Sequence, residues 1–193
     1  SQYEAVMKGN SIGMNPNPSQ DLGSDHPVEF VSRVDIEAFV NVFNNQHPEL
    51  INQGWKFALP TEAEWEYACR AGTNTVYSWG NGINPSNVNY VGSGFGKIKE
   101  VGKYAPNPWG FYDMHGNIIE WVSDWYGSYA LGPIVDPNGP GSGSRGTLRG
   151  GSYSSWYPVR AAQRIPVNSV GYKHTGAGGF GFRISLKKFV PSG

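Results

Sequence analysis

The chain has 193 residues, of which 38% are hydrophobic and only 16% charged, with fifteen basic side chains balancing fifteen acidic ones. No Lys/Arg cluster is dense, so charge gives no reason to expect a nucleic-acid partner. A single cysteine, Cys69, excludes an internal disulfide and a cysteine-based metal site.

The first third of the chain favours helices. Residues 2–8 predict a short helix that stops at Gly9, and Val28-Glu29-Phe30-Val31 resembles a short strand. Apolar residues at helical spacing predict a helix from Asp35 to about Gln46. Thr61, three residues before Glu64, forms a capping box that begins a helix over 62–71.

Beyond Gly72 the pattern changes to short aromatic-rich runs separated by Gly, Pro, Asn and Ser. The expected strands are 118–123, 146–152, 159–164 and 180–186, and 133–144 is expected to be a loop. We therefore expect a single α+β domain over 1–193, helical at first and a loop-rich sheet afterwards.

Neither a membrane span of roughly 18 apolar residues nor a signal peptide is visible in the sequence. Because the chain begins abruptly in a helix-like segment, we expect that a leader or surface anchor could lie upstream of Ser1.

Four segments in series carry a family resemblance. They are Ala58-Leu-Pro-Thr-Glu-Ala-Glu-Trp-Glu-Tyr-Ala-Cys-Arg-Ala-Gly72, Asn107-Pro-Trp-Gly-Phe-Tyr-Asp-Met-His-Gly-Asn-Ile-Ile-Glu-Trp121, Arg149-Gly-Gly-Ser-Tyr153 and Gly181-Phe-Arg183. In this order and spacing the chain resembles the formylglycine-generating-enzyme, or sulfatase-modifying factor, family. The resemblance implies a C-type lectin-like fold with an antiparallel sheet, whose opening strand would lie upstream of Ser1.

The resemblance also implies a calcium ion, held by the side chains of Asp113 and Glu120 and the carbonyls of Gly116 and Ile118. Calcium prefers such a mixture of carboxylate and carbonyl oxygens. The alternative is that Asp113 and Glu120 are ordinary turn and strand residues. A second family site would use Asn87 and the Val88 carbonyl, but it has Ser93 where an aspartate is expected.

The family's oxidase chemistry needs a cysteine pair just after the Gly-Gly-Ser motif, because thiolates are the soft ligands that copper(I) selects. Here the stretch begins Ser154-Ser155-Trp156, and serine cannot replace a thiolate. Cys69 lies among the apolar residues of a predicted helix, where a buried inert thiol is expected. We therefore expect no copper-dependent oxidase activity.

The segment 150–183 carries a set of residues typical of binding loops, in which aromatic side chains give contact area and Ser and Asn give hydrogen bonds. The candidate ligand-binding residues are Ser154, Ser155, Trp156, Tyr157, Ile165, Asn168, Ser169, Tyr172, Lys173 and His174. The alternative for Trp156 and Tyr157 is that their rings turn into the core.

This segment is similar in place and framing to the variable region of proteins diversified by retroelements, which share the lectin-like scaffold. The leading hypothesis is therefore a non-enzymatic variable protein that binds a protein or surface ligand, at the cell surface or outside the cell. The second is an enzyme of the same fold, with Asp124, Arg160 and Arg164 as the first candidates for an unrecognised active site. The third is a structural subunit of a larger assembly.

Overall fold

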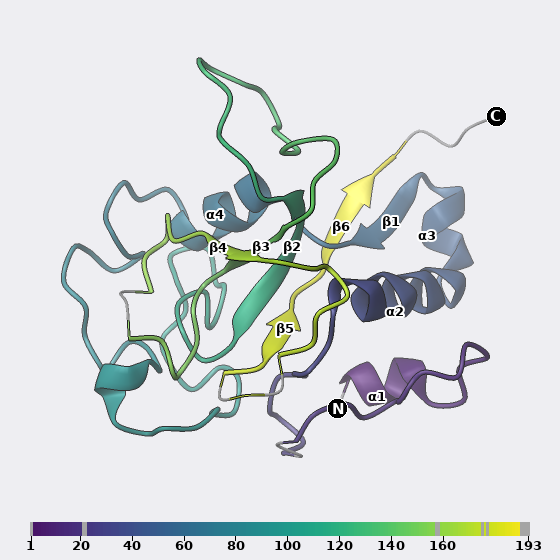
Figure 1. Ribbon diagram of the computed structural model, residues 1–193, viewed down its shortest axis with the longest axis horizontal. Coiled ribbons are helices and arrows are strands. Elements are labelled where there is room, and N and C mark those ends of the chain that lie inside the picture. Colours follow the sequence, from purple (N-terminus) through teal and green to yellow (C-terminus); the bar gives the residue numbers. More distant parts are fainter. Residues whose placement is uncertain (1, 21–22, 157–158, 175, 177, 190–193) are drawn as a thin grey trace.

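The computed structural model describes residues 2–20, 23–156, 159–174, 176 and 178–189 (Figure 1). The helices come first and most strands later, as the sequence predicts for an α+β chain. In chain order the elements are α1 Gln2–Met7, α2 Arg33–Asn45, α3 Pro48–Asn52, β1 Trp55–Ala58, α4 Glu62–Arg70, the 3-10 turn η1 Val91–Ser93, β2 Ile119–Trp125, β3 Gly146–Arg149, β4 Ile165–Val167, β5 Phe180–Phe182 and β6 Ser185–Lys188.

Capping boxes begin the two longest helices. At α2 the Ser32 hydroxyl accepts from the Asp35 amide, while the Asp35 carboxylate accepts from the Ser32 amide. Thr61 and Glu64 exchange the same two bonds at α4, so the capping box predicted there is confirmed. The helix α4 ends at Ala71, which is in the left-handed conformation with φ 47°.

The main sheet has four strands in the order β4-β3-β2-β5. Strand β2 pairs antiparallel with β3 but parallel with β5, so the sheet is mixed rather than purely antiparallel. The predicted strand 180–186 is two strands, because the chain leaves the main sheet after Phe182 and β6 pairs with β1 in a separate two-stranded sheet.

Two predicted strands are wrong. The segment 28–31 is interrupted by Phe30, whose φ of 59° is left-handed and cannot continue an extended strand. At 159–164 the Ala161 amide bonds instead to the Val76 carbonyl, and the chain turns where Gln163 bonds back to Arg160. The strand that pairs with β3 comes immediately afterwards, at Ile165–Val167.

Strand β2 lies at the centre of the molecule and is buried on both faces. Ile119 and Trp121 face the main core, where they pack with α1, α2 and Leu148 of β3. Val122 faces the opposite side and packs with Trp65 and Cys69 of α4. This alternation along one strand places α2 and α4 on opposite sides of the sheet.

The segment between β2 and β3 projects from the body as a long loop, at the top of Figure 1. In the part of the chain that the structure describes, every helix is too short or too polar to span a bilayer.

Candidate ligand-binding surface

A buried ion network fixes the start of the candidate loop. The Arg149 side chain is 0% exposed, and its guanidinium donates to Glu62, to Glu66 and to the Ala161 carbonyl. It also lies 5.2 Å from the Trp65 ring. These bonds explain why arginine ends β3: a planar fork can hold two carboxylates of α4 at once.

After Arg149 the chain reverses sharply through two glycines. Gly150 and Gly151 have φ of 86° and 73°, which side-chain-bearing residues rarely adopt. A Cβ on Gly151 would approach Val159 to 2.6 Å, so the glycine is also needed for close packing. The turn closes where the Ser152 amide donates to the Ser155 hydroxyl at 2.9 Å.

The serines of this loop differ in exposure. Ser155 is only 5% exposed and its hydroxyl holds the turn, so it belongs to the framework rather than to the exposed surface. Ser154 is half-buried, and its hydroxyl lies 3.1 Å from that of Ser152. In contrast, Trp156 is 87% exposed, so the alternative of a core tryptophan is wrong. Tyr157 lies outside the described residues.

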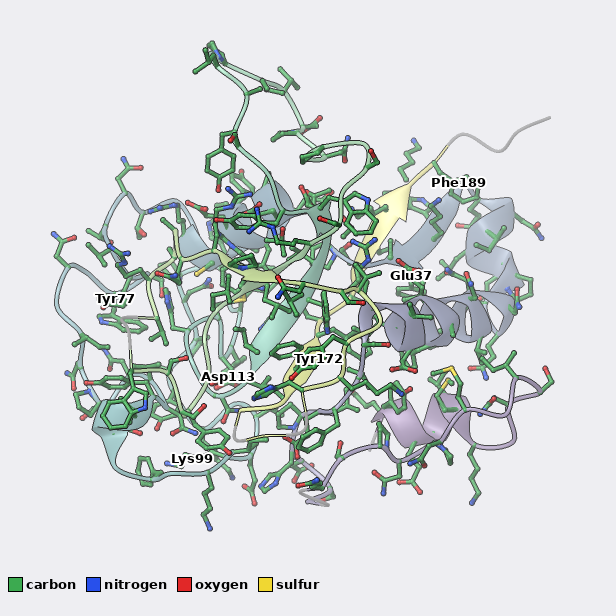
Figure 2. The ribbon with its side chains drawn as sticks, in the orientation of Figure 1. Glu37, Tyr77, Lys99, Asp113, Tyr172 and Phe189 are labelled. Atoms are coloured by element: carbon green, nitrogen blue, oxygen red, sulfur yellow. The ribbon has the colours of Figure 1, made fainter. Side chains whose placement is uncertain are left out.

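The second half of the segment returns beside the first. A Cβ on Gly178 would meet the Ser152 and Ser154 hydroxyls at 2.5 and 2.4 Å, so the two stretches touch here. His174 stacks on Phe180 of β5 at 5.1 Å, and Tyr172 lies 6.0 Å from the same ring while remaining 47% exposed. Figure 2 shows Tyr172 beside β5.

Of the remaining candidate ligand-binding residues, some are exposed on the surface and one packs against the core beneath it. Asn168 is exposed, and Ser169 is exposed at a turn where its hydroxyl accepts from the Gly171 amide. Lys173 is exposed but forms an ion pair of 2.9 Å with Asp35 of α2. Ile165 lies in β4 and packs against the main core, so it supports the surface from below. We call the exposed and half-buried residues Ser154, Trp156, Asn168, Ser169, Tyr172, Lys173 and His174 the aromatic loop surface.

Cys69 is not a reactive thiol in this fold. Burial raises its pKa to about 12, so the thiolate is absent at neutral pH. Its sulfur lies 3.4 Å from Nε2 of His115, which also accepts from the Ser78 amide. Since Nδ1 of His115 lies 2.7 Å from the Val159 carbonyl, the ring is a neutral structural group. Burial lowers its pKa to about 4.

Two of the four residues expected to hold calcium, Asp113 and Glu120, interact with the same arginine, Arg183, just after β5, while Gly116 and Ile118 are buried. Glu120 accepts from Trp65 Nε1 at 2.7 Å and from both ends of the Arg183 guanidinium at 2.6 and 2.7 Å. The Asp113 carboxylate accepts from the Gly102 amide, and burial raises its pKa. Two carboxylates against one guanidinium leave an excess negative charge, so the set fits a cation at Asp113 better than at Glu120.

No group of three or more His, Cys, Asp or Glu side chains within the described ranges could hold a metal, so calcium there would depend on carbonyls and water. At the second site suggested by the resemblance, the Ser93 hydroxyl lies 2.7 Å from the Tyr90 carbonyl and 3.1 Å from Oδ1 of Asn89.

The three candidate residues for an unrecognised active site do not all lie in one place. Asp124 and Arg164 both line a cleft beside α4, whereas Arg160 is exposed and lies within 3.4 Å of Gln163. Local sequence patterns do not predict this cleft, because its opposite wall is the irregular loop 127–140.

The comparison with known sequences covers nearly the whole chain. Residues 3–188 match the family described as the sulfatase-modifying factor enzyme 1-like domain. The chain is 34% identical to a formylglycine-generating enzyme of Streptomyces coelicolor, over 88% of this chain and 55% of that protein. It is 30% identical to the enzyme of the same name from Bos taurus, over 88% of this chain and 46% of that protein. The chain thus spans about half the length of these curated relatives.

Solved structures agree with the sequence comparison. Treponema denticola variable protein 1 superposes with a TM-score of 0.77 at 28% identity, over 96% of this chain and 80% of that one. PvdO from Pseudomonas aeruginosa superposes with a TM-score of 0.67 at 23% identity, over 86% and 64% of the two chains, which shows the fold alone. The predicted C-type lectin-like fold is confirmed, and the chain belongs to the sulfatase-modifying factor enzyme 1-like domain family.

Proposed function

We propose that this chain is a non-enzymatic ligand-binding protein, a variable protein of the kind diversified by retroelements, which presents the aromatic loop surface to a protein or surface ligand. Its place would be the cell surface or the outside of the cell. The observation that carries the proposal is Trp156, which is 87% exposed beside the serine that replaces the family's first catalytic cysteine.

The fixed ends of the loop support this proposal. Buried Arg149 holds one end, and Arg183, paired with Glu120, follows the other. Between these ends, side chains such as Trp156 and Asn168 are exposed, so their replacement should cost little packing. A rigid frame with tolerant positions is what a diversified surface requires. The similarity to a protein named variable protein 1 points the same way.

The alternative is catalysis, because the curated relatives are named formylglycine-generating enzymes. Oxidation of a substrate thiol would need a redox ion, and the loop after Gly151 offers hydroxyls where thiolates are required. Cys69 is buried on the helix α4 and cannot supply one.

Two measurements test the proposal. Sequences of the natural locus from related strains should differ mainly within codons 154–174, at adenines of a near-identical template copy, with codons 149–152 and 180–183 unchanged. The purified chain, supplied with copper and a thiol peptide, should consume no more oxygen than copper and peptide alone. Uniform divergence along the locus, or copper-dependent oxidation of the peptide, would overturn it.

We also propose a structural calcium ion, bound by the carboxylates of Asp113 and Glu120 with the carbonyls of Gly116 and Ile118. Support comes from the half-buried Asp113 carboxylate, which accepts one described hydrogen bond, from the Gly102 amide, and so has oxygen lone pairs left for a cation. Asp113 would be the principal carboxylate ligand, because Glu120 already accepts from Trp65 and Arg183. Calcium should therefore raise the melting temperature of the chain. Asp113→Asn should remove that increase while Asp136→Asn, on the projecting loop, should keep it. An equal response in both variants would contradict this site.

A further inference from the structure

A cleft of 710 Å³ lies between α4 and the projecting loop, on residues that the aromatic loop surface does not use. Its α4 wall includes Ala63 and Tyr67, and the loop contributes Tyr129, Ile134 and Pro137. Figure 1 shows this loop standing away from the body near α4. The lining is largely apolar, which suits an organic ligand better than a free inorganic ion.

Most charges around the cleft are neutralised within the protein. Glu62 receives Arg149 and Arg164 as well as the Tyr129 hydroxyl. Glu66 receives Arg149 and, at 2.8 Å, Arg70. These carboxylates and guanidiniums pair with one another, although Nε of the buried Arg149 has no hydrogen-bond partner among the described residues.

Asp124 is the charged residue lining the cleft that forms no direct ion pair with a described residue. It is only 4% exposed, yet it lines the cleft. Its Oδ2 atom accepts from the Glu62 amide at 2.7 Å and lies 3.3 Å from the Ser123 hydroxyl. Among the described residues, none donates a hydrogen bond to its Oδ1 atom and none forms a salt bridge with the carboxylate, while the charges of Arg33 and Lys187 act on it from farther away.

The projecting loop places a glycine, Gly139, next to Oδ1 of Asp124. A Cβ on Gly139 would lie 2.8 Å from Oδ1 of Asp124, so any side chain there would cover the oxygen. Gly139 also has φ of 68°, a conformation that favours glycine. The carboxylate thus stays accessible at the edge of an apolar cleft. Burial raises the pKa of Asp124, and this outweighs the opposing effects of the hydrogen bond from the Glu62 amide and of the Lys187 charge.

We propose that this cleft binds a small organic ammonium, an apolar chain or ring whose protonated amine donates to Oδ1 of Asp124. An anion would meet the unpaired carboxylate, and a neutral apolar molecule would leave that carboxylate buried without a partner. An ammonium supplies the donor that Oδ1 lacks and a positive charge in direct contact with the carboxylate, while its apolar body covers Tyr67 and Ile134. The site is independent of the aromatic loop surface.

Hexylamine, hexanol and hexanoate are matched probes, because they share one chain and differ in the charge of the head group. Titration followed by NMR or calorimetry at pH 7.5 should show hexylamine binding at least about 10-fold more tightly than the other two. Asp124→Asn keeps an acceptor for the Glu62 amide but removes the charge, so it should lower hexylamine affinity about 10-fold.

A second variant, Ala63→Leu, keeps the inference testable if Asp124→Asn fails to fold. Ala63→Leu fills the cleft from α4 without touching any charge, and it should weaken hexylamine to a similar degree. Val101→Ala, at an exposed residue that belongs to neither the cleft nor the aromatic loop surface, should bind hexylamine as the unmodified chain does. Because the cleft and the aromatic loop surface share no residue, failure of hexylamine binding is distinguishable from failure of the proposed function. The inference is overturned if hexanol binds as tightly as hexylamine, if hexylamine does not bind, or if Asp124→Asn and Ala63→Leu leave its affinity unchanged.

Discussion

Replacing Arg149 tests quantitatively how the start of the loop after β3 is held in place. Its side chain is fully buried and neutralises parts of both Glu62 and Glu66. The substitution Arg149→Met keeps a long side chain of similar shape but removes the charge. Among the described residues, it leaves Arg70 as the cationic partner of Glu66 and Arg164 as that of Glu62. Breaking a buried ion network from one side costs about 3–5 kcal/mol, since a carboxylate stays buried without full compensation.

The cost can be converted into measurable shifts. With a urea m-value of about 2 kcal/mol/M for a chain of this size, 4 kcal/mol moves the unfolding midpoint down by about 2 M. In a thermal scan the same change lowers the melting temperature by roughly 8–16 °C, at 2–4 °C per kcal/mol. Because small domains are stable by only about 5–15 kcal/mol, the variant would be close to its folding limit.

Urea denaturation followed by tryptophan fluorescence measures this directly, with Arg160→Met as the matched control. Arg160 is exposed, so its replacement should change the free energy of unfolding by less than about 0.5 kcal/mol. If Arg149→Met costs less than about 1 kcal/mol, the network does not hold the loop, and the argument for a fixed frame is refuted.

Three further predictions follow from burial. Trp156→Ala should change the free energy of unfolding by less than about 0.5 kcal/mol, because the side chain is 87% exposed, whereas Trp121→Ala should cost about 3–5 kcal/mol; equal costs in urea titrations would contradict the exposure. Cys69 should react with a thiol reagent only as fast as the chain unfolds; rapid stoichiometric labelling of the native protein would show that the thiol is accessible. The pKa of His115 is about 4 against an ordinary value of 6.5, so between these values the unfolded chain binds more protons than the folded one, and stability should fall by about 3 kcal/mol as pH drops through this window. His115→Gln should flatten that part of the plot of unfolding free energy against pH. The control His47→Gln, which alters a partly exposed ring, should leave the plot unchanged. If the plot is unchanged in both variants, His115 is not the cause.

The candidate surface could be predicted in part. Local composition correctly placed Trp156 and Tyr172 at exposed positions, because loops rich in Ser, Asn and Gly keep large rings accessible. It could not separate Ser154 from Ser155, since only the turn geometry sends one hydroxyl inward. Nor could it show that Lys173 is paired with Asp35, which lies on a helix far earlier in the chain.

The sequence by itself determined the α+β order of elements, the beginning of α4 and the absence of a cysteine pair after Gly151, whereas α2 begins at Arg33, two residues before the predicted start. These features depend on neighbouring residues, so a local pattern contains them. The tertiary structure alone decided the parallel pairing of β5, the split between β5 and β6 and the cleft beside α4. Each depends on contacts between distant segments, such as Glu62 with Arg164, which are 102 residues apart and which no local pattern specifies.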